Sequence, residues 1–133
     1  MRVLLALGGN AMTAPDGSAT PAAQIAAIEV AMQAAARLVA AGHELVVTHG
    51  NGPQVGNLLV KNELAAHVVP PVPLDWCGAQ TQGTLGFTIL DALDGALAST
   101  GSGEATTRRH PFSPRSSQTW PCSIICRACS AGR

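Results

Sequence analysis

The chain has 133 residues, enough for one modest domain with a hydrophobic core, and 47% of them are apolar. Aromatic residues make up only 3% and Tyr is absent, which argues against a surface that stacks nucleic acid bases. A formal net charge of zero removes the electrostatic case for binding nucleic acid or an anionic membrane.

The charges are unevenly distributed along the chain. Through Thr100 there are three basic and seven acidic residues, whereas the segment from Gly101 to Arg133 holds five Arg and one acid, Glu104. That segment is rich in Ser, Arg, Pro and Cys and has neither a helical nor a strand period. We therefore predict an ordered unit over residues 1–99 and a disordered or frameshifted tail over residues 100–133.

The N-terminal apolar run is too short for a signal peptide and ends in a glycine turn. No uninterrupted apolar stretch reaches the ~18 residues that a membrane span needs. These features predict a cytoplasmic protein without a membrane-spanning segment.

The predicted elements begin with a short aliphatic strand. Val3–Leu7 is a continuous apolar run, typical of a strand buried on both faces, and Asn10–Ser18 is typical of a loop. Thr20 and Pro21 predict a helix start, because Thr can cap a helix and Pro is tolerated at its first position. Gly42 predicts the end of that helix.

A second strand, Glu44–Thr48, follows directly, and Pro53 opens another helix. Strand, helix and strand in this order form a βαβ unit, which implies two parallel strands joined by a right-handed crossover. The sequence therefore predicts an α/β fold with a mainly parallel sheet.

A third helix is predicted over roughly Trp76–Leu97, with Asp75 as its cap. It contains Gly78, Gly83 and Gly86, and each glycine inside a helix costs about 1 kcal/mol relative to Ala. We expect another backbone to approach the helix closely at these positions, either within the domain or across a dimer.

Glycine-rich loops follow both predicted strands and emerge at the carboxyl edge of the sheet, where open α/β folds bind ligands. Glycines let backbone N–H groups approach a ligand, the following helix adds its partly positive N-terminus, and the two Asn side chains can donate. We predict a phosphate or carboxylate site here, with ordinary tight turns as the alternative. The predicted site residues are Gly8, Gly9, Asn10, Gly50, Asn51 and Gly52.

Other candidates are weaker. His49 either orients the second loop or satisfies a backbone group, and Lys61, the only lysine, is predicted to lie on the surface. Neither a Gly-x-x-x-x-Gly-Lys-Ser/Thr loop nor a Gly-x-Gly-x-x-Gly fingerprint follows either strand. Cys122, Cys126 and Cys129 fit no strong zinc pattern, so no metal site is assigned.

Three segments carry a resemblance to the carbamate kinase family. They are Val3-Leu4-Leu5-Ala6-Leu7-Gly8-Gly9-Asn10-Ala11, the run from Val47 to Leu59, and Pro73-Leu74-Asp75 continued by Thr81-Gln82-Gly83 and Gly86. Many members of the wider amino acid kinase superfamily have a lysine where this chain has Ala6. That position favours carbamate kinase over acetylglutamate, aspartate or nucleoside-monophosphate kinases.

The resemblance implies a three-layer sandwich, incomplete in this chain, and a phosphotransferase that interconverts ATP and carbamate with ADP and carbamoyl phosphate. It implies Mg²⁺ with the nucleotide, a homodimer for a full-length relative, and a place in arginine metabolism. The two glycine loops would hold the transferred phosphoryl group and the carbamate.

The resemblance stops near Ser99, and the family's catalytic lysines and nucleotide-binding half lie beyond the matched stretch. No lysine follows Lys61, so no catalytic residue is assigned, and Arg108 and Arg109 lie in unpatterned sequence. We expect a truncated, inactive fragment of a carbamate kinase. The alternative is a non-catalytic anion-binding or regulatory half-domain.

Overall fold

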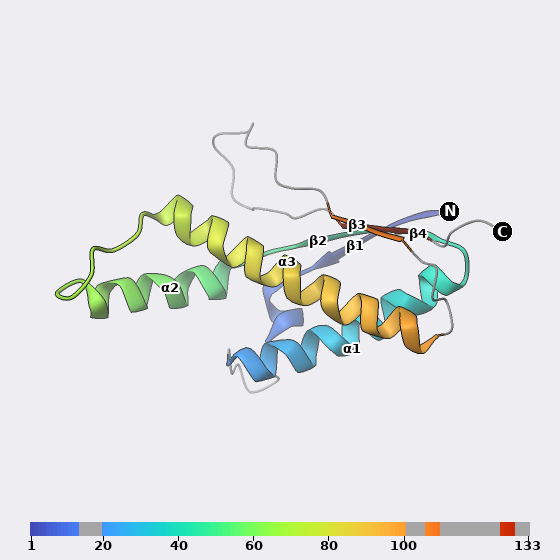
Figure 1. Cartoon of the computed structure of the whole chain (residues 1–133), viewed down its shortest axis with the longest axis horizontal. Coiled ribbons are helices and arrows are strands. Elements are labelled where there is room, and N and C mark those ends of the chain that lie inside the picture. The colour runs from blue at the N-terminus through green and yellow to red at the C-terminus, as the bar shows by residue number, and fades with distance from the viewer. Residues whose placement is uncertain (14–19, 101–105, 110–125, 130–133) are drawn as a thin grey trace.

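The computed structural model describes residues 1–13, 20–100, 106–109 and 126–129. Figure 1 shows a small sheet with two long helices on one of its sides and a third helix that reaches beyond it. The elements in chain order are β1 (Arg2–Leu7), the 3₁₀ helix η1 (Gly9–Met12), α1 (Pro21–Ala40), β2 (Glu44–His49), α2 (Gly52–Ala65), α3 (Leu74–Ser99), β3 (Thr106–Arg109) and β4 (Cys126–Cys129).

The sheet has the strand order β1-β2-β4-β3. β1 and β2 are parallel and in register from the pair Arg2–Glu44 to the pair Leu7–His49. α1 joins them, which confirms the predicted βαβ unit. The parallel pairing matters for function because it brings the ends of β1 and β2 to the same edge of the sheet.

Helix α1 begins and ends where the sequence predicts. The hydroxyl of Thr20 accepts a hydrogen bond from the backbone N–H of Ala23 at 3.3 Å, and Pro21 occupies the first turn. Just past the end, Gly42 has a φ of +85°, a conformation that a side chain disfavours.

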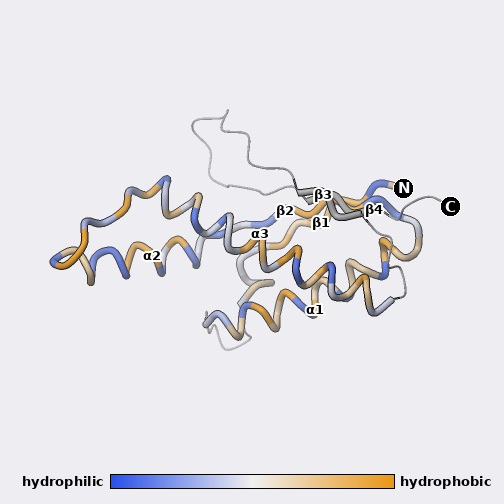
Figure 2. Tube along the Cα trace, in the orientation of Figure 1, coloured by the Kyte–Doolittle hydropathy of each residue, from blue (hydrophilic) through white to orange (hydrophobic). Residues whose placement is uncertain are grey.

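The core lies between the sheet and the pair α1 and α3. Its fully buried side chains come from η1, α1, β2 and α3, and Figure 2 shows apolar positions recurring along these helices. Such a close-packed aliphatic core fixes the position of β2 relative to α3. Its largest fully buried members are Met12, Ile28, Met32, Leu45, Leu85, Ile89 and Leu93.

The other face of β1 is open. Exposure alternates along the strand, and Leu4 is 67% exposed on the face away from the helices. The prediction that Val3–Leu7 is buried on both faces is therefore wrong for the described chain, because α1 and α3 cover one face of the sheet and no described helix covers β1 on the other.

Within the described ranges, α1 is the one helix whose length and composition would allow it to cross a membrane. The sequence analysis expected no such segment because it required an uninterrupted apolar run, and Glu29 and Arg37 interrupt this one. The mean hydropathy of α1 is nevertheless high enough for a membrane span. Ile28, Met32 and Val39 are completely buried between α1 and its neighbours, so the helix packs as a core element.

Three local predictions need correction. The expected loop over Asn10–Ser18 begins as the helix η1, which buries Met12 completely, whereas residues 14–19 lie outside the described chain. Helix α3 starts at Leu74 after Pro73, so Asp75 lies in its first turn and does not cap it. A side chain at Gly78 or Gly83 would meet open space, so the expected close approach within the domain is wrong for these two glycines, and approach across a dimer stays a prediction.

Two short pieces of the tail join the sheet. β4 pairs antiparallel with β2, and β3 pairs antiparallel with β4. Apart from Thr100, the remainder of the predicted tail, Cys122 included, lies outside the described residues, and the boundary near Ser99 stays a prediction.

Candidate functional site

The two glycine-rich loops lie side by side at the carboxyl edge of β1 and β2. The backbone N–H of Gly50 donates to the carbonyl of Leu7 at 3.1 Å, so the second loop starts where the first strand ends. A Cβ on Gly9 would lie 3.2 Å from Cδ of Pro53, so the first loop contacts the start of α2. The structure thus brings together the two segments that the sequence singled out.

The glycines of these loops do not serve unusual backbone angles. Gly42 is the one described glycine with a positive φ, and Gly8 has an ordinary extended conformation at φ −70° and ψ 161°. Only Gly9 is constrained by space, because Pro53 fills its surroundings. A Cβ at Gly8, Gly50 or Gly52 would meet nothing within 4 Å. The packing of the described residues therefore gives no reason for glycine at these three positions.

The side chain of Asn51 is turned toward α3. It is 6% exposed, and its Nδ2 donates to Oγ1 of Thr81 at 2.8 Å and to the carbonyl of Gly78 at 3.3 Å. Both amide hydrogens are thus engaged, so the predicted donation from this side chain to an anion is not available in this conformation. The side chain of Asn10, the other predicted donor, lies outside the described part of the molecule.

His49 ends β2 and is almost completely buried. Its Nδ1 lies 3.1 Å from the carbonyl oxygen of Gly50, and because a carbonyl can only accept, Nδ1 must carry the hydrogen. Burial lowers the pKa of His49 below its usual value, and the bond to Gly50 partly opposes this shift. The ring therefore satisfies a backbone group, one of the two roles that the sequence left open.

The start of α2 supplies electrostatic attraction for an anion. Its first intrahelical bond runs from the N–H of Val55 to the carbonyl of Asn51 at 3.0 Å. The N–H groups of Gly52 and Gln54 precede that bond and so have no intrahelical acceptor. The aligned peptide dipoles of the helix add partial positive charge at this end.

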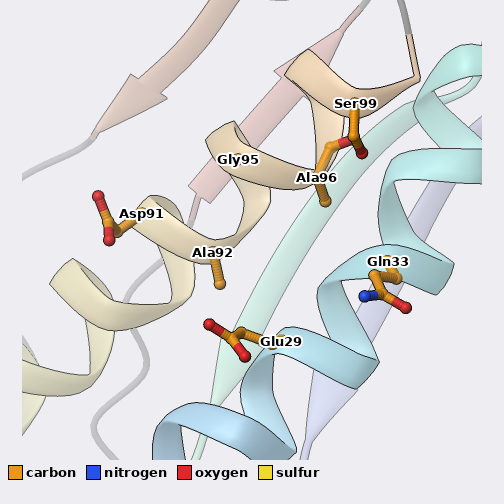
Figure 3. Close-up of a pocket in the computed structure, with 7 residues that line it drawn as sticks. All are labelled: Glu29, Gln33, Asp91, Ala92, Gly95, Ala96 and Ser99. Carbon is orange, nitrogen blue, oxygen red and sulfur yellow. The ribbon is translucent and has the colours of Figure 1, made fainter.

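Two of the grooves on the described part of the molecule lie between its helices. The one in Figure 3, about 350 Å³, runs between α1 and α3 and carries the carboxylates of Glu29 and Asp91, which makes it unsuited to an anion. The other, about 300 Å³, lies between the start of α1, α2 and α3 and includes Lys61 and Thr81 in its lining. Lys61 is exposed there, as predicted.

The described residues offer no evident ligand set for a metal ion. No three His, Cys, Asp or Glu side chains gather anywhere in the described ranges. The chemistry available at the sheet edge is therefore backbone donation and helix polarity, which suits phosphate or carboxylate oxygens.

Known proteins resemble this chain over the stretch that contains β1, β2 and both loops. The sequence model of the amino acid kinase family matches residues 1–106. The chain belongs to the amino acid kinase family. It is 45% identical over 102 residues to carbamate kinase from Trichomonas vaginalis, and 40% identical over 101 residues to carbamate kinase from Latilactobacillus sakei. These alignments cover 76% and 75% of this chain, but 32% of each relative.

Solved structures agree with these relatives. Carbamate kinase from Giardia lamblia bound to citric acid aligns with a TM-score of 0.71 and 37% identity over 75% of this chain and 32% of its own. A protein from Aeropyrum pernix aligns with a TM-score of 0.72 and 35% identity, over 77% and 33% of the two chains. The predicted α/β class is confirmed in incomplete form, and the chain spans about a third of the length of the relatives it matches.

Sequence reasoning missed the residues that support the loop from α3. Thr81 belongs to the Thr81-Gln82-Gly83 segment that carried the family resemblance, but no role was assigned to it. Its hydroxyl holds Asn51, as described above. The available signal was its spacing, because Thr81 lies four residues from both Cys77 and Leu85 and so shares their helix face. Both neighbours are buried, and a buried polar side chain needs a hydrogen-bond partner.

Proposed function

We propose that this chain supplies the phosphoryl- and carbamate-binding part of a carbamate kinase-type phosphotransferase, which interconverts ATP and carbamate with ADP and carbamoyl phosphate. The observation that carries the proposal is the open space at Gly8, Gly50 and Gly52 on one sheet edge. Nothing in the described residues packs against these glycines, which leaves room for a ligand close to the backbone.

The arrangement suits phosphoryl transfer because that reaction depends on positioning and on charge stabilisation more than on covalent chemistry. The backbone N–H groups of Gly52 and Gln54 would donate to phosphoryl or carbamate oxygens, whereas the N–H of Gly50 is already bonded to the carbonyl of Leu7. The side chain of Asn51 does not take part in this donation, because its amide hydrogens bond to α3.

ATP or ADP with Mg²⁺ is the co-substrate that the kinase family implies. The Giardia carbamate kinase has been solved with AMP-PNP and with citric acid, which supports a nucleotide and a carboxylate as ligands of this fold. The described residues do not provide a ligand set for the metal ion.

For the 133 residues alone we propose binding without turnover. The loops contain no Lys or Arg to stabilise the charge of the transferred phosphoryl group, and the single lysine, Lys61, lies exposed on α2. The second candidate function is a non-catalytic anion-binding or regulatory half-domain. It is favoured because β1, β2 and α2, all within this chain, hold both loops in place. A cytoplasmic location stays a prediction.

We propose that two copies of the chain form a homodimer through the helical hairpin of α2 and α3. Large apolar side chains are exposed along it, and an exposed apolar surface of this kind indicates a contact with a protein partner. They include Val60, Leu64, Trp76 and Phe87.

The test is a pair of measurements on the purified chain. Broadening of the ³¹P signal of carbamoyl phosphate on addition of the chain is expected, because the anion binds at the loops. No ATP is expected from carbamoyl phosphate, ADP and Mg²⁺ in a luciferase assay. Robust ATP formation would overturn the assignment of binding without turnover, and an unaltered ³¹P signal would overturn the binding site itself.

A further inference from the structure

The loop that follows β2 is held to α3 by a buried side-chain contact. Asn51 Nδ2 donates to Thr81 Oγ1 at 2.8 Å, across 30 residues of sequence. The Thr81 hydroxyl lies 3.0 Å from the carbonyls of both Cys77 and Gly78 and can donate its one hydrogen to either while accepting from Asn51. Asn51 is thus linked to the backbone of α3 through one hydroxyl group, in addition to its direct bond to Gly78.

We propose that Thr81 is a positioning residue for the anion-binding loop, which it fixes through Asn51 so that the backbone N–H groups after Asn51 face the anion. This inference rests on the proposed function, because it assigns a task to a residue beside that site. It also assigns Asn51 a role as an anchor of the loop in place of the donor role that the sequence suggested.

Burial makes this contact strong enough to matter. Asn51 is 6% exposed and Thr81 is 5% exposed, so water has little access to either group. Loss of the hydroxyl would leave an amide hydrogen of Asn51 buried without its acceptor, which is more costly than the bond itself is favourable. The loop would then move to rehydrate Asn51, and Gly50 and Gly52 on either side would offer little resistance.

A second contact on the same loop fixes the direction of one of its N–H groups. The His49 ring donates to the carbonyl of Gly50 at 3.1 Å, and the described chain contains no cis peptide bond. In a trans peptide the C=O and N–H point in opposite directions, so the N–H of Asn51 points away from the buried ring. The ring fixes the peptide between Gly50 and Asn51, and Thr81 fixes the side chain that follows it.

Helix α3 provides matched controls for the hydroxyl. Thr84 and Thr88 also donate to the carbonyl four residues earlier, at 3.0 Å and 2.9 Å. Thr88 contacts no residue of the loop in the hydrogen bonds of the described chain. Thr88→Val therefore removes the same helical bond as Thr81→Val while leaving Asn51 untouched.

The experiment uses the ¹⁵N-labelled 133-residue chain, with inorganic phosphate as the probe. Two quantities are measured for the wild type, Thr81→Val, Thr81→Ser and Thr88→Val: the phosphate Kd and the ¹⁵N order parameters of Gly50 and Gly52. Thr81→Val should lower the order parameters and raise the Kd about tenfold, which corresponds to ~1.4 kcal/mol. Thr81→Ser should restore both quantities, and Thr88→Val should match the wild type.

A merely structural role of Thr81 would lower the melting temperature without changing either quantity in the folded protein. Wild-type order parameters and Kd in folded Thr81→Val would therefore overturn the inference. If the wild type binds no phosphate, the proposed function fails, and the order parameters still decide whether Thr81 positions the loop. If Thr81→Val does not fold, Thr81→Ala and Asn51→Ala are measured in the same way, and wild-type loop order in either folded variant overturns the inference.

Discussion

Replacement of Gly50 by Ala separates the needs of the fold from the needs of the ligand. A Cβ at Gly50 would meet nothing within 4 Å, and the residue does not have a positive φ. Gly→Ala at such a position stabilises a protein by about 0.4–1 kcal/mol, because the unfolded chain loses conformational freedom. We expect Gly50→Ala to be as stable as the wild type or slightly more stable, but to bind phosphate about tenfold more weakly.

Gly9→Ala, by contrast, should destabilise the fold. Its Cβ would lie 3.2 Å from Cδ and 3.3 Å from Cγ of Pro53, so the proline ring must shift by a few tenths of an ångström. Such overpacking costs about 1 kcal/mol, the low end of the usual range, because Pro53 is exposed and can yield. At a typical urea m-value of about 2 kcal/mol/M, the unfolding midpoint should fall by about 0.5 M.

The assay combines urea unfolding, followed by circular dichroism, with phosphate titration. Gly56→Ala is the matched control, because Gly56 lies on α2 outside the loops and also has open space around it. This control should retain the wild-type phosphate affinity. The reasoning is refuted if Gly50→Ala binds phosphate as tightly as Gly56→Ala does, or if Gly50→Ala destabilises the fold as much as Gly9→Ala.

Three further predictions concern the core, the buried histidine and self-association. Leu93→Ala should lower the free energy of unfolding by about 2–5 kcal/mol, because Leu93 is fully buried. Leu64→Ala, at a 72% exposed position, should change it by less than ~0.5 kcal/mol. Equal losses for the two variants in urea unfolding would contradict this prediction. Burial lowers the pKa of His49, so the unfolded chain binds more protons than the folded chain near pH 6. Stability should therefore fall as the pH drops below about 6.5. His49→Gln should weaken this dependence of the melting temperature on pH, and an unchanged dependence would contradict the prediction. Trp76→Ser combined with Phe87→Ser should convert a dimer to a monomer in light scattering, and a monomeric wild type or a dimeric double variant would rule out the proposed interface.

Local patterns were enough to predict the elements that form the site. The cap at Thr20, the stop at Gly42 and the two aliphatic strands specify β1, α1 and β2 through short-range chemistry. A βαβ unit can pair its strands in parallel, so the meeting of both glycine loops at one edge also followed from the sequence. The family resemblance rested on those same loops.

Features that depend on the rest of the fold could not be predicted. The open face of β1 at Leu4 differs from the expected two-sided burial, since the composition of a strand does not reveal which faces neighbouring elements cover. The contact between Asn51 and Thr81 joins residues 30 positions apart, and only the packing of α3 against the loop brings them together. Pairing of β4 with β2 involves a segment without any strand period.

The most direct test of the central claim is a phosphate titration of the ¹⁵N-labelled chain followed residue by residue. We expect saturable shifts of the backbone amide signals of Gly52 and Gln54, with little change at Lys61. Shifts centred on Lys61, or none at the loops, would contradict an anion site at the edge of β1 and β2.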